Sequence, residues 1–89
     1  MRAVVTVIGK DTVGILAKVS SVCSEHNANV IEVSQSVLQD LFAMVMLIDI
    51  SKINEEFSTL QSQLEKAGKQ MGLSITAMHE KIFNSMHKI

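Results

Sequence analysis

The hydrophobic pattern of the chain changes period several times, and each change marks a new structural element. β-Branched side chains fill most of positions 4–8, so residues 1–9 are predicted to form a strand with apolar side chains on both faces. From Val13 to about His26, apolar residues recur three and four positions apart, which is the spacing of an amphipathic helix. The core stripe of this helix is expected to contain Ile15 or Leu16, Val19, Val22 and Cys23. The sequence Asn27-Ala28-Asn29 should end the helix, because asparagine tolerates the left-handed conformation.

Two strands joined by a tight turn are predicted next. Residues 30–38 alternate, with Ile31, Val33 and Val37 on one face and Glu32, Ser34 and Ser36 on the other. Residues 41–50 are apolar on both faces. Only Gln39-Asp40 separates the two runs, so they are expected to form a hairpin.

The second half of the chain predicts a helix, a short strand and a tail helix. The helix is expected to start within residues 51–54, with Ser51 or Asn54 as N-cap, and to end at Gly72. Its apolar positions are Ile53, Phe57, Leu60, Leu64, Ala67 and Met71. Residues 73–78 predict a strand with alternate residues inward, and residues 80–89 predict an amphipathic helix.

The element order predicts an α+β fold, a ferredoxin-like βαββαβ two-layer sandwich with a short C-terminal helix. Its antiparallel sheet should have the strand order 4-1-3-2. Residues 1–79 are expected to form one domain and residues 80–89 the tail helix. Both long helices cover one face of such a sheet, yet the first and third strands are apolar on both faces. The uncovered face therefore needs a partner, the tail, or both, and a homodimer is expected.

Composition narrows the class of protein. The chain has 89 residues, of which 47% are hydrophobic and 19% charged, as expected for one globular domain. The formal net charge of −1 argues against a direct nucleic-acid partner. No apolar run approaches the roughly 20 residues needed to cross a membrane, and no signal peptide is evident. A single cysteine cannot form an internal disulfide, so a cytoplasmic protein is predicted.

The turn Gly9-Lys10-Asp11-Thr12-Val13-Gly14 joins the first strand to the first helix. A helix start carries unpaired N–H groups and roughly half a positive charge, which suits a carboxylate or another anion. Asp11 or Thr12 is the predicted N-cap, and Asp11 could also receive a ligand ammonium group. A side chain at Gly14 would block close approach to the helix start. The plainer interpretations are that Asp11 only caps the helix and Gly14 only allows tight packing.

Other candidate chemistry is weaker. Cys23 and His26 lie three residues apart, and His79 and His87 could complete a metal site, but a cysteine on a core stripe is more commonly a buried small hydrophobe. No metal or cofactor is therefore predicted. Met44, Met46, Met78 and Met86 could line an adaptable binding surface, although such residues more often fill a core or an interface. No nucleophile elbow, phosphate loop or paired carboxylates are evident, so no enzymatic activity is predicted.

The segment from Gly9 to Ser20 resembles the opening signature of the ACT domain family: a small residue, a polar residue, Asp, two residues, Gly, and an apolar helix start. The resemblance continues at Asn27-Ala28-Asn29-Val30-Ile31 and at Phe42-Ala43-Met44-Val45-Met46. With Asp49 and residues 82–89, the pattern is similar to small stand-alone ACT proteins. Those are related to the glycine-cleavage-system repressor and to the amino-terminal part of formyltetrahydrofolate deformylase. One departure is Val13, where many relatives have proline.

The resemblance implies a regulatory domain. Many ACT domains bind an amino acid or similar metabolite between paired domains, and many pair side by side through the second strand. It places Lys10, Asp11, Thr12, Val13, Gly14 and Ile15 at the ligand edge, opposite Asn29, Val30 and Ile31. The predicted function is a homodimeric small-molecule sensor. The alternative is a ligand-free interaction module that recruits an enzyme or regulator, and a metal-binding protein is a weaker third hypothesis.

Overall fold

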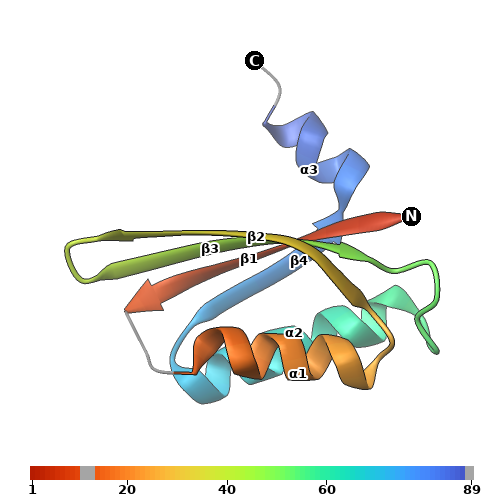
Figure 1. The fold of residues 1–89 in the computed structure, drawn as a ribbon, viewed down its shortest axis with the longest axis horizontal. Helices are drawn as coiled ribbons and strands as arrows, with labels where there is room; N and C mark the ends of the chain where they lie inside the picture. The colour runs from red at the N-terminus through yellow and green to blue at the C-terminus, as the bar shows by residue number, and fades with distance from the viewer. Residues whose placement is uncertain (11–13, 88–89) are drawn as a thin grey trace.

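The computed structural model describes residues 1–10 and 14–87, and it confirms the predicted ferredoxin-like fold. The elements are β1 (Arg2–Lys10), α1 (Ile15–Glu25), β2 (Asn29–Leu38), β3 (Leu41–Asp49), α2 (Phe57–Met71), β4 (Ser74–His79) and α3 (Glu80–Met86). The sheet order is β2-β3-β1-β4 with antiparallel neighbours, which is the predicted order viewed from the other edge. Helices α1 and α2 lie together against one face of the sheet (Figure 1).

The core lies between that face and the two long helices. The largest fully buried side chains come from the central strands and from both helices: Val5, Val7, Met44, Met46, Ile48, Val19, Cys23, Leu60 and Leu64. Burying a large apolar side chain contributes about 1.5–3 kcal/mol, so this layer supplies most of the driving force for folding. Strand β3 presents Met44, Met46 and Ile48 to this core, whereas Val45 on its other face is exposed.

The ends of both long helices follow the sequence prediction. Asn27 has φ 60°, and the Ala28 N–H donates to the Cys23 carbonyl at 2.8 Å, which closes α1. Gly72 has φ 72°, and the Leu73 N–H donates to the Gly68 carbonyl at 2.8 Å, which closes α2. Both are Schellman motifs, in which the left-handed residue lets the next N–H groups satisfy the last carbonyls.

The predicted helix starts were wrong. The N-cap of α1 is Gly14 in the left-handed conformation, not Asp11 or Thr12, and residues 11–13 lie outside the described part of the chain. The N-cap of α2 is Glu56 rather than Ser51 or Asn54.

Ser51 lies six residues before Phe57, the first residue of α2, and takes part in a local hydrogen-bonded turn instead. The Ser51 N–H and hydroxyl both donate to the Asp49 carboxylate, at 2.9 and 2.7 Å. The hydroxyl hydrogen bond is the main cause that holds the pKa of Asp49 below its usual range, with the N–H hydrogen bond second. These two hydrogen bonds close the turn at the end of β3.

Strand β2 contains a β-bulge that the alternation of its sequence did not reveal. Val30 pairs with Ile48 and Glu32 pairs with Leu47, so Ile31 has no partner of its own on β3. The prediction that Ile31 shares a face with Val33 is therefore wrong, because the extra residue shifts the strand by one position. Val30 and Val33 pack against the core, and Ile31 is left exposed.

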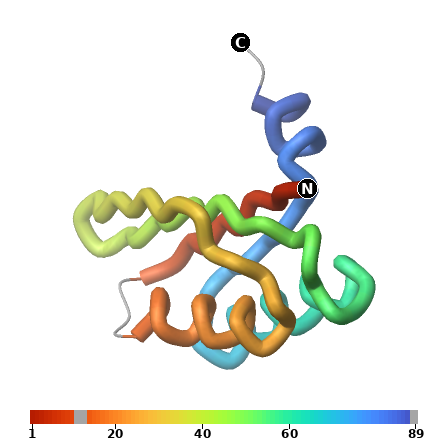
Figure 2. The backbone as a smooth tube through the Cα atoms, turned by 45° about the vertical axis from the view of Figure 1, so that its right-hand side comes forward, coloured from red at the N-terminus to blue at the C-terminus, as the bar shows by residue number. Residues whose placement is uncertain are grey.

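Helix α3 rises from the sheet face opposite α1 and α2, as both views of the backbone show (Figures 1 and 2). Its start is fixed by Arg2, whose guanidinium donates to both carboxylate oxygens of Glu80 at 3.0 and 2.7 Å. The predicted tail extended to residue 89, but residues 88–89 lie outside the described part of the chain. Within the described residues, none of the helices combines the length and apolar character required to span a bilayer.

Candidate functional site

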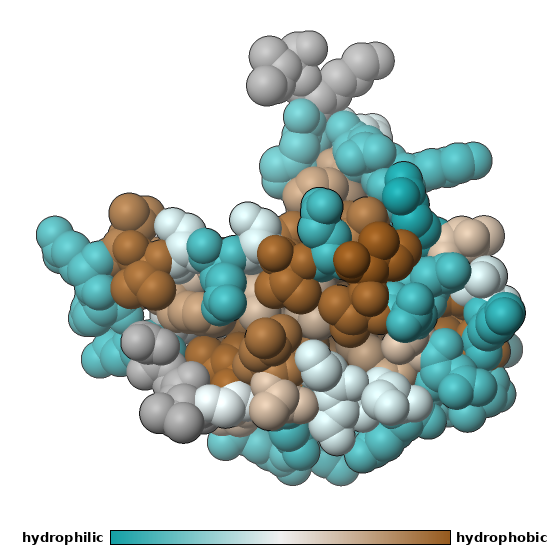
Figure 3. Space-filling view, viewed as in Figure 1, coloured by the Kyte–Doolittle hydropathy of each residue, from teal (hydrophilic) through white to brown (hydrophobic). Residues whose placement is uncertain are grey.

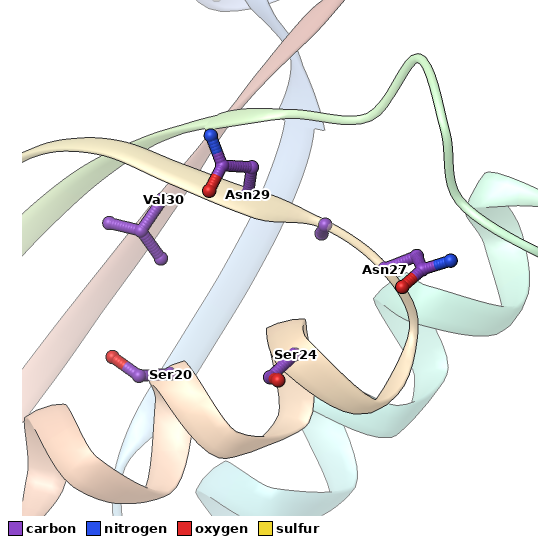
Figure 4. Close-up of a pocket in the computed structure, with 6 residues that line it drawn as sticks. Ser20, Ser24, Asn27, Asn29 and Val30 are labelled. Atoms are coloured by element: carbon purple, nitrogen blue, oxygen red, sulfur yellow. The ribbon is translucent and has the colours of Figure 1, made fainter.

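A pocket of about 440 Å³ opens between the second half of α1 and the start of β2 (Figure 4). Small-molecule sites in proteins have volumes of roughly 300–1,000 Å³, so this pocket is large enough for a metabolite. The described residues that line it are Ser20, Ser24, Asn27, Ala28, Asn29 and Val30.

The pocket is built by the way the chain leaves α1. The Schellman motif at Asn27 turns the backbone directly into β2, so the strand runs back over the helix that precedes it. Ser20 and Ser24 are four residues apart and therefore lie on the same side of α1. Both lie below the opening in Figure 4, while Val30 points toward α1 from β2.

The lining is polar without being charged. Its described residues supply two hydroxyl groups, two side-chain amides and the apolar surface of Ala28 and Val30. Hydroxyl and amide groups can each donate and accept hydrogen bonds. This chemistry suits an uncharged polar or apolar part of a ligand, and it provides no counter-ion for a charged one.

The residues predicted for the ligand site fall into two groups. Asn29 and Val30 line the pocket, whereas Ile31 is the exposed bulge residue next to it and is not among the lining residues. Lys10 is at the end of β1, and Gly14 precedes α1.

Of the remaining predicted site residues, one is buried in the core and three lie outside the described part of the chain. The Ile15 side chain is 2% exposed in the core, so Ile15 can offer a ligand only its backbone. Asp11, Thr12 and Val13 lie outside the described residues. Sequence reasoning missed Ser20, Ser24, Asn27 and Ala28 as pocket residues. The available signal was the four-residue spacing of two serines on a helix that ends at the Asn-Ala-Asn turn.

The two groups of predicted site residues lie at opposite ends of α1. The helix has 11 residues, which corresponds to a length of about 16 Å. Figure 1 shows the end of β1 and the start of α1 at one end of the molecule and the start of β2 at the other. One copy of the chain therefore does not bring Gly14 and Asn29 to the same small ligand.

The four candidate metal ligands are engaged separately. Cys23 is buried in the core, and His26 Nδ1 contacts the Glu55 carboxylate. The His79 ring packs on Phe57 with centroids 4.4 Å apart, and the His87 ring stacks on Phe83 at 4.1 Å. Across residues 1–10 and 14–87, no three histidine, cysteine, aspartate or glutamate side chains are grouped to hold a metal ion.

Burial makes Cys23 a poor nucleophile and gives a testable prediction. Desolvation raises the pKa of the Cys23 thiol from 9.0 to about 11. At pH 8 the thiolate fraction should then be about 100-fold lower than for a free thiol, and burial slows access further. We expect iodoacetamide to leave the folded protein unmodified at pH 8 and to alkylate it rapidly in denaturant, as measured by intact mass.

The same shift predicts the sign of a pH effect. Because the pKa is higher in the folded state, the unfolded chain loses the thiol proton first, and stability should fall as pH rises from about 9 toward 11. The Cys23→Ala variant serves as the control and should lack this component. Rapid alkylation of the native protein would contradict the buried placement of Cys23.

The comparisons with known proteins identify the family. A family pattern described as "ACT domain" matches residues 2–78. The chain belongs to the ACT domain family. This confirms the resemblance found at the β1–α1 turn, and ACT domains are generally ligand-binding regulatory domains.

Three relatives of this ACT domain illustrate the match. The chain is 49% identical over 88 residues to a UPF0237 protein of Methanocaldococcus jannaschii, covering 99% of this chain and 98% of that protein. An ACT domain protein from Streptococcus pneumoniae has a TM-score of 0.81 and 34% identity, over 93% of both chains. A formyltetrahydrofolate deformylase from Burkholderia mallei has a TM-score of 0.77 at 14% identity, over 88% of this chain and 28% of that one. The last likeness is one of fold alone.

Proposed function

We propose that this ACT domain binds an amino acid or a related small metabolite at the interface between two copies of the chain. The observation that carries the proposal is the position of the pocket. It lies at the C-terminal end of α1, away from Gly14 at the start of the helix, so a site that uses both needs the helix start of a second copy.

The edge strand β2 offers a surface for that second copy. It is the outer strand of the sheet beside the pocket, and it exposes Ile31, Val37 and Leu38. Leu16 is exposed on the adjacent helix α1. Figure 3 shows apolar side chains gathered along this sheet edge and beneath it, while the lower surface of the helices is hydrophilic. An apolar surface at an unpaired strand edge favours pairing with another chain.

Antiparallel pairing of two β2 strands would assemble the site. A twofold axis between the strands places the start of β2 in one copy near the end of β2 in the other. The end of β2 lies on the same side of the molecule as the end of β1 and the start of α1 (Figure 1). A ligand carboxylate could then meet the free N–H groups at the start of α1 in one copy. The rest of the ligand would lie among the hydroxyl and amide groups of the other copy's pocket.

Such a site couples binding to assembly. A ligand held by both copies binds the paired state more tightly than the separated chains, so it stabilises that state by mass action. A partner protein that binds the paired state and the separated chains differently would therefore respond to the metabolite concentration. The proposed sensor acts in the cytoplasm, which is consistent with a free and buried Cys23.

Thermal unfolding against a panel of free amino acids and related metabolites tests the proposal. A selective ligand present at about 100 times its Kd should stabilise the protein by about 2.7 kcal/mol, which raises Tm by on the order of 10 °C in a small domain. The increase should depend on protein concentration if the site spans two copies. No change with any ligand would contradict sensing and would favour the ligand-free interaction module instead.

The interaction module remains the second candidate because of one observation. The sheet face opposite α1 and α2 exposes Ile8, Leu41 and Val45, beyond what the proposed edge pairing covers. A surface of this kind recruits a protein partner in many complexes. Stable complex formation in the absence of any small molecule would distinguish this function from ligand sensing.

A further inference from the structure

A second hollow lies between helices α1 and α2, and we call it the interhelical groove. It has a volume of about 170 Å³. Val22 and Ala67 line it and are buried, so they form an apolar base. The side chains around this base are polar, exposed and supplied by both helices: Lys18, Glu25, Gln63, Lys66 and Gln70.

The interhelical groove is separate from the pocket between α1 and β2. Lys18 and Val22 line the groove, whereas Ser20 and Ser24 line the pocket. Each serine follows its counterpart by two residues, which is a rotation of about 200° around the helix. The groove and the pocket therefore lie on opposite sides of α1, and they share none of their described lining residues. The groove is formed within one copy of the chain.

Two ammonium groups and one carboxylate line the groove without engaging one another. Across residues 1–10 and 14–87, the side chains of Lys18, Glu25 and Lys66 form neither a hydrogen bond nor an ion pair. Lys18 and Glu25 are seven residues apart on α1, which is about two helical turns. A ligand could therefore reach all three charged groups without breaking an existing ion pair.

The direction of the helices sets the order of these charges along the groove. Helices α1 and α2 run antiparallel (Figure 1). Lys18, near the start of α1, therefore lies toward Gln70, near the end of α2. Glu25 is the last residue of α1 and lies toward Gln63, and Lys66 falls between the two glutamines. The order along about 10 Å of helix is ammonium, ammonium, carboxylate.

We infer that the interhelical groove binds an acidic amino acid, such as glutamate or aspartate. Such a molecule carries two carboxylates and one ammonium group, which complement Lys18, Lys66 and Glu25. The side-chain carboxylate meets Lys18, the α-carboxylate meets Lys66, and the ammonium group meets Glu25, each through a charge-assisted hydrogen bond. The groove has the volume of about six waters at roughly 30 Å³ each, which is enough for one amino acid.

This site differs in chemistry from the pocket between α1 and β2. The described lining of that pocket has no charged group, so it cannot select a ligand by charge. The groove selects by charge, and its charged side chains are exposed to solvent. Salt should therefore weaken binding in the groove. Because the groove is complete in one chain, the affinity should not depend on protein concentration.

Nuclear magnetic resonance of the isotope-labelled chain at low ionic strength tests the inference. L-Glutamate is the ligand, L-glutamine lacks its second carboxylate, and glutarate lacks its ammonium group. L-Glutamate should shift the backbone amide resonances of Lys18, Val22 and Ala67. It should bind about fivefold more tightly than either analogue, which is the effect of one exposed charge contact.

Charge-removing variants assign each contact. Lys66→Gln and Glu25→Gln should each weaken L-glutamate binding about fivefold. Glu25→Gln should not weaken glutarate binding, because glutarate has no ammonium group for the carboxylate to meet. The matched controls are Lys69→Gln and Glu65→Gln, which make the same charge changes at exposed positions of α2 that do not line the groove. Both controls should keep the wild-type affinity.

The outcomes separate this inference from the proposed function. Equal L-glutamate affinities of Lys66→Gln and Lys69→Gln overturn the groove site, because only net charge would then matter. Shifts confined to Ser24 and Asn29, and lost in a Ser24→Leu variant, place the ligand in the other pocket and also overturn it. Shifts at the groove that persist in Ser24→Leu support the site whether or not the pocket binds a metabolite. The absence of any shift with L-glutamate or L-aspartate overturns the inference.

Discussion

Replacing Ser24 with leucine should abolish ligand-induced stabilisation while leaving the domain folded. Ser24 lies on α1 at the opening of the pocket, and a leucine side chain would occupy the space that a ligand needs. The backbone carbonyl of Ser24, which accepts the Asn27 N–H at 3.1 Å, is unaffected by the change. Leucine also favours helix. The entire stabilisation of about 2.7 kcal/mol expected at 100 times Kd should be lost.

Ser21→Leu provides the matched control. Ser21 is exposed on the same helix and is not among the residues that line the pocket. The measurement is Tm with and without the ligand found in the metabolite panel, together with the molar mass of each variant. Ser24→Leu should lose the ligand response and Ser21→Leu should keep it. Equal responses in the two variants would place the ligand elsewhere on the domain.

Replacing Gly68 with valine should destabilise the fold by about 3 kcal/mol. A Cβ atom at Gly68 would lie 2.8 Å from Ile75 Cγ1 and 3.0 Å from the backbone oxygen of Leu73. Ile75 is a buried residue of β4 and the oxygen belongs to the α2–β4 connection, so neither can move freely. Valine adds two further methyl groups, and overpacking of this kind displaces the backbone.

The expected loss is a large share of the total for a chain of this size, because stability is only about 0.05–0.15 kcal/mol per residue. Urea denaturation monitored by circular dichroism measures it. Ser62→Val is the control, since Ser62 is exposed on the same helix and should change stability by less than about 0.5 kcal/mol. A Gly68→Val midpoint equal to that of the control would show that α2 and β4 tolerate a wider separation.

Both predictions concern how closely the helices approach the sheet. Gly68 sets the distance between α2 and β4, and the Gln61 side-chain amide donates to the Ala77 carbonyl at 2.7 Å across the same contact. On the other side of the layer, the turn at Asn27 sets the distance between α1 and β2, where the pocket opens. The tight contact between α2 and β4 stabilises the fold, and the wider separation between α1 and β2 leaves room for a ligand.

Local patterns in the sequence were sufficient for the order of the elements and for the C-terminal ends of α1 and α2. Hydrophobic periodicity reflects a geometry that each element has on its own. The left-handed residues Asn27 and Gly72 end helices for a reason contained in a few residues. The resemblance to the ACT domain family could also be recognised from the sequence, because its opening signature lies in one continuous segment.

The start of α2, the register of β2 and the residues that line the pocket could not be predicted from local patterns. Helix α2 starts only at Phe57, so Ser51 and Asn54 precede its N-cap, Glu56. Ile31 leaves the face of Val33 because pairing with β3 forces an extra residue into β2. Ser20 and Ser24 become pocket residues only because β2 returns over α1. Register and the space between layers arise when elements meet, so no local period encodes them.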